Sequence, residues 1–140
     1  MKRSKIIFIV LAILLIVFLS VILSFHINSI VRNQSDKEVE ILVIIDFGTL
    51  KETDNYLEYY VNVTEGSSAF NAFTLVANLT ITNYPFGVYI RGVNGYVEEL
   101  PNFWIFYYYD LGLKEWVYSA VGVSHYYLYE GYRIKLQYNG

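Results

Sequence analysis

The sequence predicts an α+β fold class: one helix packed on a mixed sheet, behind a single N-terminal transmembrane helix. Three observations carry this prediction. Residues 6–25 are apolar and uncharged, several later segments alternate apolar and polar side chains with the period of a strand, and residues 67–78 repeat at the helical period. The length of 140 residues leaves room for one such domain.

Residues 6–25 contain no charged side chain and only two serines. A helix of that length spans about 30 Å, the thickness of a bilayer's hydrocarbon core, so we expect a transmembrane anchor. A cleavable signal peptide is the alternative, but its apolar region usually runs about 7 to 15 residues and ends in a small-x-small site. The bulky Phe18 and Ile22 occupy positions where such a site needs a small residue.

The basic residues that precede this segment predict its orientation; they are Lys2, Arg3 and Lys5. The positive-inside bias keeps residues 1–5 in the cytoplasm and places everything after about residue 26 outside. The expected location is therefore the cell membrane, with a single pass and the lipid bilayer as a partner. Polar residues 26–38 are interpreted as a stalk, and residues 39–140 as the exported, extracellular domain.

The exported part is acidic. All thirteen Asp and Glu residues lie at or after Asp36, against six Lys or Arg there, so this part carries about seven net negative charges. Nucleic acid is excluded as a partner because it would need clustered Lys and Arg. The chain has no cysteine, so the domain is stable without disulfides, and its fifteen tyrosines supply much of the buried area.

The domain begins with a predicted hairpin. Residues 39–47 are β-branched and half polar on the second face, which indicates a strand near the centre of a sheet. Residues 56–63 alternate more clearly, and residues 48–55 are the hairpin loop. A serine cap at the start of residues 67–78 then predicts one short amphipathic helix.

Further strands follow the helix. Residues 88–100 are extended around an Asn-Gly turn at Asn94 and Gly95. Later strands are predicted at residues 103–109, 114–123 and 129–138, with a turn at residues 110–112. Two strands, one helix and several strands is the element order of an α+β domain, for which the ubiquitin-like β-grasp is the commonest solution; the order leaves other α+β topologies open.

The residues also resemble a family. The matching segments are residues 65–70, which open the helix, then GVYIRGVNG (87–95), FWIFYYY (103–109) and LYEGYRIKLQY (128–138). Together they are similar to the carboxy-terminal β-grasp domain of transcobalamin and its prokaryotic relatives of largely unknown function, over nearly all of residues 39–140. In the vertebrate cobalamin carriers this domain closes over one face of the corrin, while a separate helical barrel holds the rest. No barrel is encoded in these 140 residues.

The resemblance implies a ligand edge, made by the strand of residues 103–109, the following turn and the loop around residues 94–99. The implied ligand-binding residues are Trp104, Phe106, Tyr108, Leu113, Asn94 and Tyr96. The implied ligand is small and cobalamin-like.

The aromatic run itself raises a question of function, because residues 103–109 are aromatic on both faces although a sheet with one helix needs only one apolar face. Loops or a second sheet layer that cover the surplus face are one explanation. An exposed aromatic patch is the other, and it fits two functions. One is a membrane-anchored binding module for a small ligand or glycan; the alternative is a structural or assembly subunit that pairs with a cell-envelope protein. A pocket flanked by Trp104 and Tyr108 would favour the first.

Enzymatic and metal chemistry have little support. His125 is the single histidine well beyond the apolar segment, and in a strand the adjacent Ser124 would point to the opposite face, so no dyad is expected. Residues 52–55 lack the glycine and final Glu of an EF-hand, and no zinc ligand set is visible. We predict no enzyme, no metal site and no cofactor. Three Asn-x-Ser/Thr sites predict glycosylation of the exported chain, at Asn33, Asn62 and Asn78.

Overall fold

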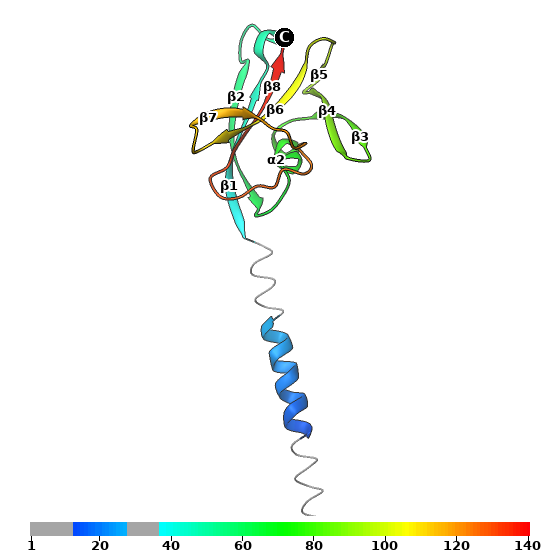
Figure 1. The fold of residues 1–140 in the computed structure, drawn as a ribbon, viewed down its shortest axis with the longest axis vertical. Coiled ribbons are helices and arrows are strands. Elements are labelled where there is room, and N and C mark those ends of the chain that lie inside the picture. The colour runs from blue at the N-terminus through cyan, green and yellow to red at the C-terminus, as the bar shows by residue number, and fades with distance from the viewer. Residues whose placement is uncertain (1–12, 28–36) are drawn as a thin grey trace, which may run out of the picture. The chain divides into compact units, whose positions relative to one another are not determined.

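The computed structural model describes residues 13–27 and 37–140 (Figure 1). The chain divides into two units, Met1–Lys37 and Glu38–Gly140. Residues 1–5, which were predicted to be cytoplasmic, and residues 28–36 of the predicted stalk lie outside the described residues.

The structure corrects one part of the predicted fold class, the transmembrane helix. A helix covers residues 13–27, while residues 6–12 of the predicted span lie outside the described residues. At about 1.5 Å per residue, its described length falls short of the roughly 30 Å of a hydrocarbon core. Among the helices that the structure describes, none combines the length and the apolar character needed to cross a bilayer, so the transmembrane part of the prediction is wrong.

The second unit is built on a five-stranded mixed sheet. Its strands follow the order β2-β1-β8-β6-β7, and only β1 and β8 are parallel. Their bounds are β1 Glu38–Asp46, β2 Tyr56–Thr64, β6 Phe103–Asp110, β7 Glu115–Tyr118 and β8 Arg133–Asn139. The α+β class is confirmed, since one helix packs on this sheet.

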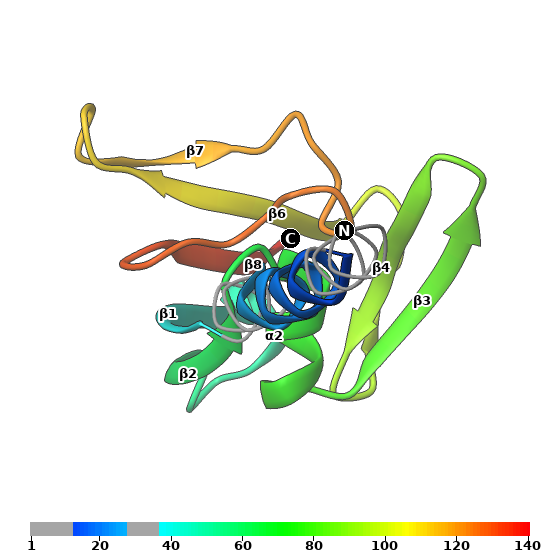
Figure 2. The same cartoon turned by 90° about the horizontal axis from the view of Figure 1, so that it is seen from below.

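That helix, α2, spans Ala69–Val76 (Figure 2). It begins where the Ser68 hydroxyl accepts a hydrogen bond from the Asn71 N–H, which satisfies one of the free donors of the first turn. Ala72 and Phe73 are fully buried against the sheet, and the Phe73 ring meets the edge of Phe106 at 5.9 Å. The capped start and the apolar spacing place α2 where the sequence predicts a helix.

The core lies between α2 and one face of the sheet. Alternate residues of each strand supply it, because successive side chains of a strand point to opposite faces. Across the middle of the sheet, Val43 of β1 lies opposite Ile134 of β8 on one side and opposite Tyr59 of β2 on the other. The largest fully buried members of the core are Val39, Ile41, Val43, Ile45, Phe47, Phe73, Val93, Leu128, Ile134 and Leu136.

A second, three-stranded sheet has the order β3-β4-β5. Its strands are β3 Leu79–Tyr84, β4 Gly87–Val93 and β5 Tyr96–Val97. Asn94 and Gly95 join β4 to β5 with positive φ angles of 51° and 88°, as the predicted Asn-Gly turn requires. Strand β3 was not predicted.

The segment between β7 and β8 is irregular, so the strand predicted over residues 114–123 is too long. Strand β7 ends at Tyr118, and the chain then turns toward the start of α2. There the Phe70 N–H donates to the Val123 carbonyl and the Ala69 N–H to the Tyr126 carbonyl. Val123 is buried as well, so the segment is held by packing and by bonds to the helix start rather than by a sheet ladder. A short 3-10 helix, η1 Gly48–Leu50, occupies the first hairpin loop.

Candidate functional site

The aromatic strand β6 divides its side chains between two faces. Trp104 and Phe106 point into the core and are only 4% and 8% exposed. Ile105 and Tyr107 lie on the other face and are half-buried. The surplus aromatic face of the prediction is therefore the one that carries Ile105 and Tyr107, whereas the residues that the resemblance marks as ligand-binding belong mainly to the core face.

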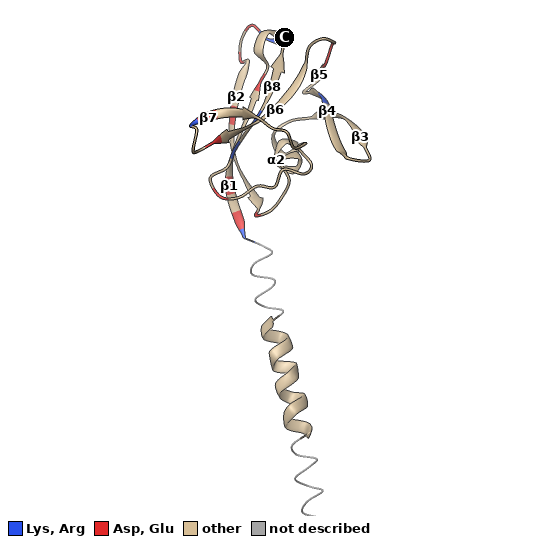
Figure 3. Cartoon of the chain, in the orientation of Figure 1, with Lys and Arg blue, Asp and Glu red and all other residues tan. Residues whose placement is uncertain are grey.

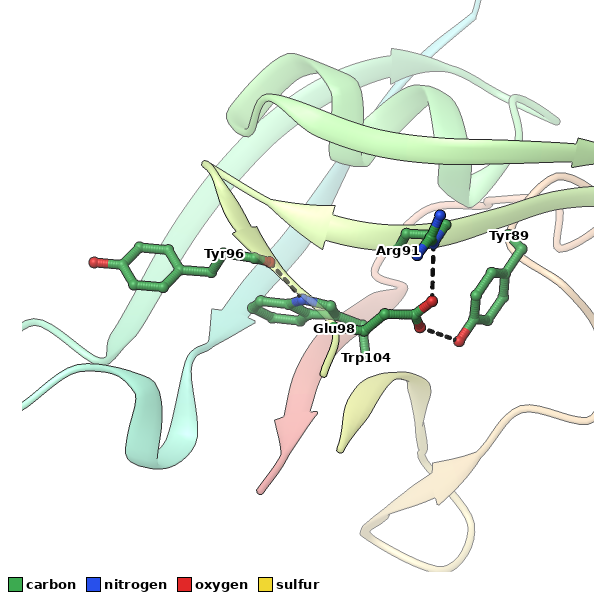
Figure 4. Close-up of polar contacts among 5 residues, drawn as sticks. All are labelled: Tyr89, Arg91, Tyr96, Glu98 and Trp104. Carbon is green, nitrogen blue, oxygen red and sulfur yellow. Dashed lines mark hydrogen bonds and ion pairs between the residues drawn. The ribbon is translucent and has the colours of Figure 1, made fainter. Parts of the chain in front are cut away.

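Trp104 anchors the turn between β4 and β5. Its indole Nε1 donates a hydrogen bond to the Tyr96 carbonyl at 3.0 Å (Figure 4). Its ring also meets the edges of Phe47 and Tyr138, each at 5.5 Å. At the tip of the same turn, the Asn94 Oδ1 accepts from the Asn78 N–H at 2.8 Å. The structure thus brings Trp104, Tyr96 and Asn94 together, although each makes a contact that the fold itself uses.

Tyr108 and Leu113 lie elsewhere. Tyr108 stacks on Tyr126 at 5.6 Å, four residues or about 13 Å along β6 from Trp104. Leu113 is exposed in the turn after β6, and Phe106 lies between the two ends of the strand, against Tyr126 at 5.2 Å. The six predicted ligand residues therefore do not gather in one place, and Trp104 and Tyr108 line two different clefts of the described domain.

A cleft of about 270 Å³ opens along β6 at the Trp104 end. Its walls come from β4, the first half of β6, the end of β7 with the irregular chain that follows it, and one residue of β8. We call it the β4–β6 cleft, and its lining residues are Val88, Tyr89, Ile90, Phe103, Trp104, Ile105, Phe106, Tyr118, Ser119, Ala120, Val121, Gly122, Val123 and Leu136. None of them is charged. The Lys, Arg, Asp and Glu residues of the domain are scattered over its strands and turns (Figure 3).

The edge of β6 at this cleft has no partner strand. Strand β8 pairs with one edge of β6 from Phe103 to Tyr108, but β7 pairs with the other edge only from Tyr107 to Asp110. The Phe106 carbonyl still accepts from the Ser119 N–H at 3.0 Å, which shows that Phe106 points its backbone groups away from β8. Trp104, two residues earlier, points its N–H and C=O in the same direction. The cleft therefore offers backbone hydrogen-bonding groups beside apolar side chains.

Of the polar side chains that line the cleft, Tyr89, Trp104 and Ser119 are already hydrogen-bonded. Glu98 accepts from the Tyr89 hydroxyl at 2.6 Å and from Arg91 Nε at 2.9 Å (Figure 4). Burial, together with this bond to Glu98, raises the pKa of Tyr89 to about 12. The Ser119 hydroxyl donates to the Val121 carbonyl. The cleft thus presents a neutral wall at ordinary pH.

A second cleft, of about 290 Å³, lies at the other end of β6 and includes Tyr108 and Asp110. The Asp110 carboxylate there accepts from the Gly112 and Leu113 N–H groups, and so closes the turn. Burial raises the pKa of the neighbouring Tyr126 to about 12, with smaller effects of nearby tyrosines and of Asp110. The one carboxylate of this cleft is thus committed to the turn, and we take the β4–β6 cleft as the candidate site.

The side chains of Ser124 and His125 lie closer together than the sequence predicts. Their segment is not a strand, so the two side chains do not point apart, and the Ser124 Oγ lies 3.1 Å from the His125 Nδ1. The same hydroxyl accepts from the Val88 N–H at 3.1 Å. No carboxylate orients His125 within residues 37–140, as a catalytic triad would require. The absence of enzymatic activity stays a prediction.

Metal ligands do not gather either. Within the described ranges, 13–27 and 37–140, no three residues of the His, Cys, Asp and Glu types approach one another closely enough to hold an ion. The predicted glycosylation sites Asn62 and Asn78 are exposed, while Asn33 lies outside the described residues.

Comparisons with known proteins define the class of fold. No family model matches the chain. No curated protein matches it significantly. The crystal structure of haptocorrin in complex with Cbi is similar with a TM-score of 0.56 and 13% sequence identity, over 74% of this chain and 25% of haptocorrin. A protein from Ruminococcus gnavus ATCC 29149, provisionally described as metal binding, is similar with a TM-score of 0.49 and 12% identity, over 72% of this chain and 96% of that one.

The similarity to haptocorrin confirms the transcobalamin-family resemblance at the level of the fold alone. The chain spans about a quarter of haptocorrin's length.

Proposed function

We propose that residues 38–140 form a binding module that holds a small, uncharged and largely apolar molecule in the β4–β6 cleft. The observation that carries this proposal is the combination of an uncharged apolar lining with the unpaired edge of β6 at Trp104. Binding sites for small molecules usually join such a lining to a few well-placed polar groups.

The lining supports affinity, and the strand edge supports orientation. Each Å² of apolar surface that the ligand buries contributes roughly 25 cal/mol. The backbone N–H and C=O of Trp104 would each bond a polar atom of the ligand, and a typical hydrogen bond adds about 1 kcal/mol. A glycan fits less well, because its many hydroxyls would meet a mostly apolar wall on which Tyr89 and Ser119 already have hydrogen-bond partners.

The size of the cleft bears on the ligand that the resemblance implies. The haptocorrin structure with this fold was solved in complex with Cbi, which supports a binding role. However, about 270 Å³ is slightly below the range of about 300–1,000 Å³ that is usual for drug-sized ligands. The ligand that we propose is therefore smaller than a corrinoid.

A cleft-filling substitution tests the proposal. Gly122 lines the cleft and a Cβ added there meets no atom within 4 Å, so the backbone accepts a side chain at this position, and Gly122→Phe is designed to fill the cleft with a ring. Gly122→Ala is the matched control, since a methyl group leaves the cleft open. Both changes are made in the full chain with Trp116→Phe, which leaves Trp104 as the single tryptophan.

The probe is N-phenyl-1-naphthylamine, an uncharged apolar fluorophore, and the signal is energy transfer from Trp104. We expect saturable transfer in the Gly122→Ala protein and at least tenfold weaker binding in the Gly122→Phe protein. Equal transfer in the two proteins, or none in either, would overturn the proposal.

A further inference from the structure

The outermost strand β2 has an edge without a partner in the part of the chain that the structure describes. The strand is nine residues long, and its Tyr60 is 69% exposed. Natural sheets protect such edges with lysine, proline, bulges or short strands. Strand β2 contains neither lysine nor proline and pairs with β1 without a register shift, whereas β7 has only four residues and β3 carries a bulge. An edge this long and regular can accept another strand.

The backbone pattern shows which groups face outward. The Phe47 N–H donates to the Asn55 carbonyl at 2.7 Å, in line with the register of β1 and β2. Antiparallel ladders alternate between bonded and non-bonded pairs, so every second residue after Asn55 is bonded to β1. The residues in between point their N–H and C=O groups to the free edge, and they are Tyr56, Glu58, Tyr60, Asn62 and Thr64.

These five residues are self-complementary. When a second β2 runs antiparallel with Tyr60 facing Tyr60, Glu58 faces Asn62 and Tyr56 faces Thr64. Every outward-pointing residue then meets another one, so the whole strand is used and about ten hydrogen bonds form. No two like charges oppose each other. A register centred on Glu58 would instead set two carboxylates against each other and leave part of the strand unpaired.

The side chains on the core face agree with the same register. Leu57 then faces Val63, and Tyr59 faces Val61. Leu57, Tyr59 and Val61 are only half-buried in one copy, and all three pack against the edge of the core cluster. A second strand would remove more of their apolar surface from water.

We propose that β2 pairs with β2 of a second copy of this chain, antiparallel about a two-fold axis at Tyr60, so that the two five-stranded sheets continue into one. The contact is isologous, because the same residues on both copies make it. This inference does not rest on the ligand proposed for the β4–β6 cleft.

Cysteine cross-linking tests both the contact and its register. The chain has no cysteine, so each variant carries one thiol. Residues in a bonded antiparallel pair have Cα atoms about 5.5 Å apart, within the range of a disulfide. We expect Tyr60→Cys to form a disulfide-linked dimer under mild oxidation. Glu58→Cys on the same strand is the control, because in this register two Glu58 residues lie four positions, or about 13 Å, apart along the strand.

The measurement uses the full chain from a bacterial host, which does not attach a glycan to Asn62, because such a glycan would stand beside Glu58 of the second copy. A mild detergent is present because the helix of residues 13–27 exposes apolar side chains. Sedimentation equilibrium at rising concentration gives the oligomeric state. We expect a dimer that Tyr60→Lys dissociates, since two ammonium groups would then face each other across the axis. Tyr118→Lys, at a similarly exposed tyrosine on the opposite edge strand, is expected to leave the dimer intact.

Circular dichroism of each variant checks that the sheet is folded. A monomer at every concentration would overturn the inference. A dimer that Tyr60→Lys does not dissociate, or one in which Glu58→Cys cross-links as readily as Tyr60→Cys, would overturn it as well, because the contact would then use another surface or another register.

Discussion

Trp104 has two roles in the structure, since it lines the β4–β6 cleft and also holds the core, and its substitution by phenylalanine separates them. Trp104→Phe removes the indole N–H that donates to the Tyr96 carbonyl, a bond with a net contribution of about 0.5–1.5 kcal/mol. It also removes part of a ring that is 4% exposed, and the space left beside Phe47 and Tyr138 adds a cavity cost. Together we expect a loss of about 2–3 kcal/mol in the free energy of unfolding.

Trp116→Phe is the matched substitution on the other face of the sheet. Trp116 is half-buried, packs on Tyr109 at 5.4 Å and on the Lys135 ammonium at 5.0 Å, and its indole N–H has no partner among the described residues. We expect a loss of about 1 kcal/mol or less. Urea unfolding followed by circular dichroism measures both values. A change of about 2 kcal/mol corresponds to roughly 10 °C in melting temperature for a domain of this size. If the two variants lost the same stability, the bond of Trp104 to Tyr96 and its packing on Phe47 and Tyr138 would not stabilise the fold more than the exposed-face contacts of Trp116 do.

Three further outcomes follow from individual contacts. Ser68→Ala removes the acceptor for the Asn71 N–H and is expected to cost about 1 kcal/mol in urea unfolding, with Ser68→Gly closer to the wild type. Glu98→Gln removes the anion beside Tyr89, so we expect the pKa of Tyr89 to fall from about 12. That pKa should stay above 10, because burial of the tyrosine is the larger cause and remains. A tyrosinate absorbance titration measures the pKa, and an unchanged value would contradict the expectation. Tyr126 keeps its proton to about pH 12 when folded but loses it near pH 10 when unfolded, so stability falls between pH 10 and 12, and Tyr126→Phe is expected to flatten that fall.

The sequence allowed the main sheet and its helix to be predicted, because their signals are local. The alternation in residues 39–47 matches the buried odd-numbered residues of β1, and the serine cap marks the start of α2. Strand β3 was missed, although Leu79 and Ile81 alternate with threonines, because most of its side chains are exposed and polar and it follows the helix directly. The location outside the cell and the glycosylation sites stay predictions.

The candidate site could be predicted only in part. Four residues of the aromatic run line the β4–β6 cleft, and their role in binding stays a prediction. The rest of the cleft's lining comes from β4, from residues 118–123 and from Leu136 of β8, which are distant in sequence, and no periodicity shows that they meet. Trp104 was expected to flank a pocket with Tyr108, but the distance of about 13 Å between them along β6 places them at different clefts.

The free edge of β2 and the β4–β6 cleft are far apart across the main sheet, because β1 and β8 lie between β2 and β6 in the strand order β2-β1-β8-β6-β7. Three strand spacings of about 4.8 Å separate β2 from β6, so pairing of two copies through β2 leaves both clefts open. We therefore expect Tyr60→Lys, which separates the copies, to bind N-phenyl-1-naphthylamine with the same affinity as the wild type. A tenfold weaker affinity in that variant would mean that the second copy completes the cleft. Such a result would refute the separation of dimer contact and cleft that the strand order implies.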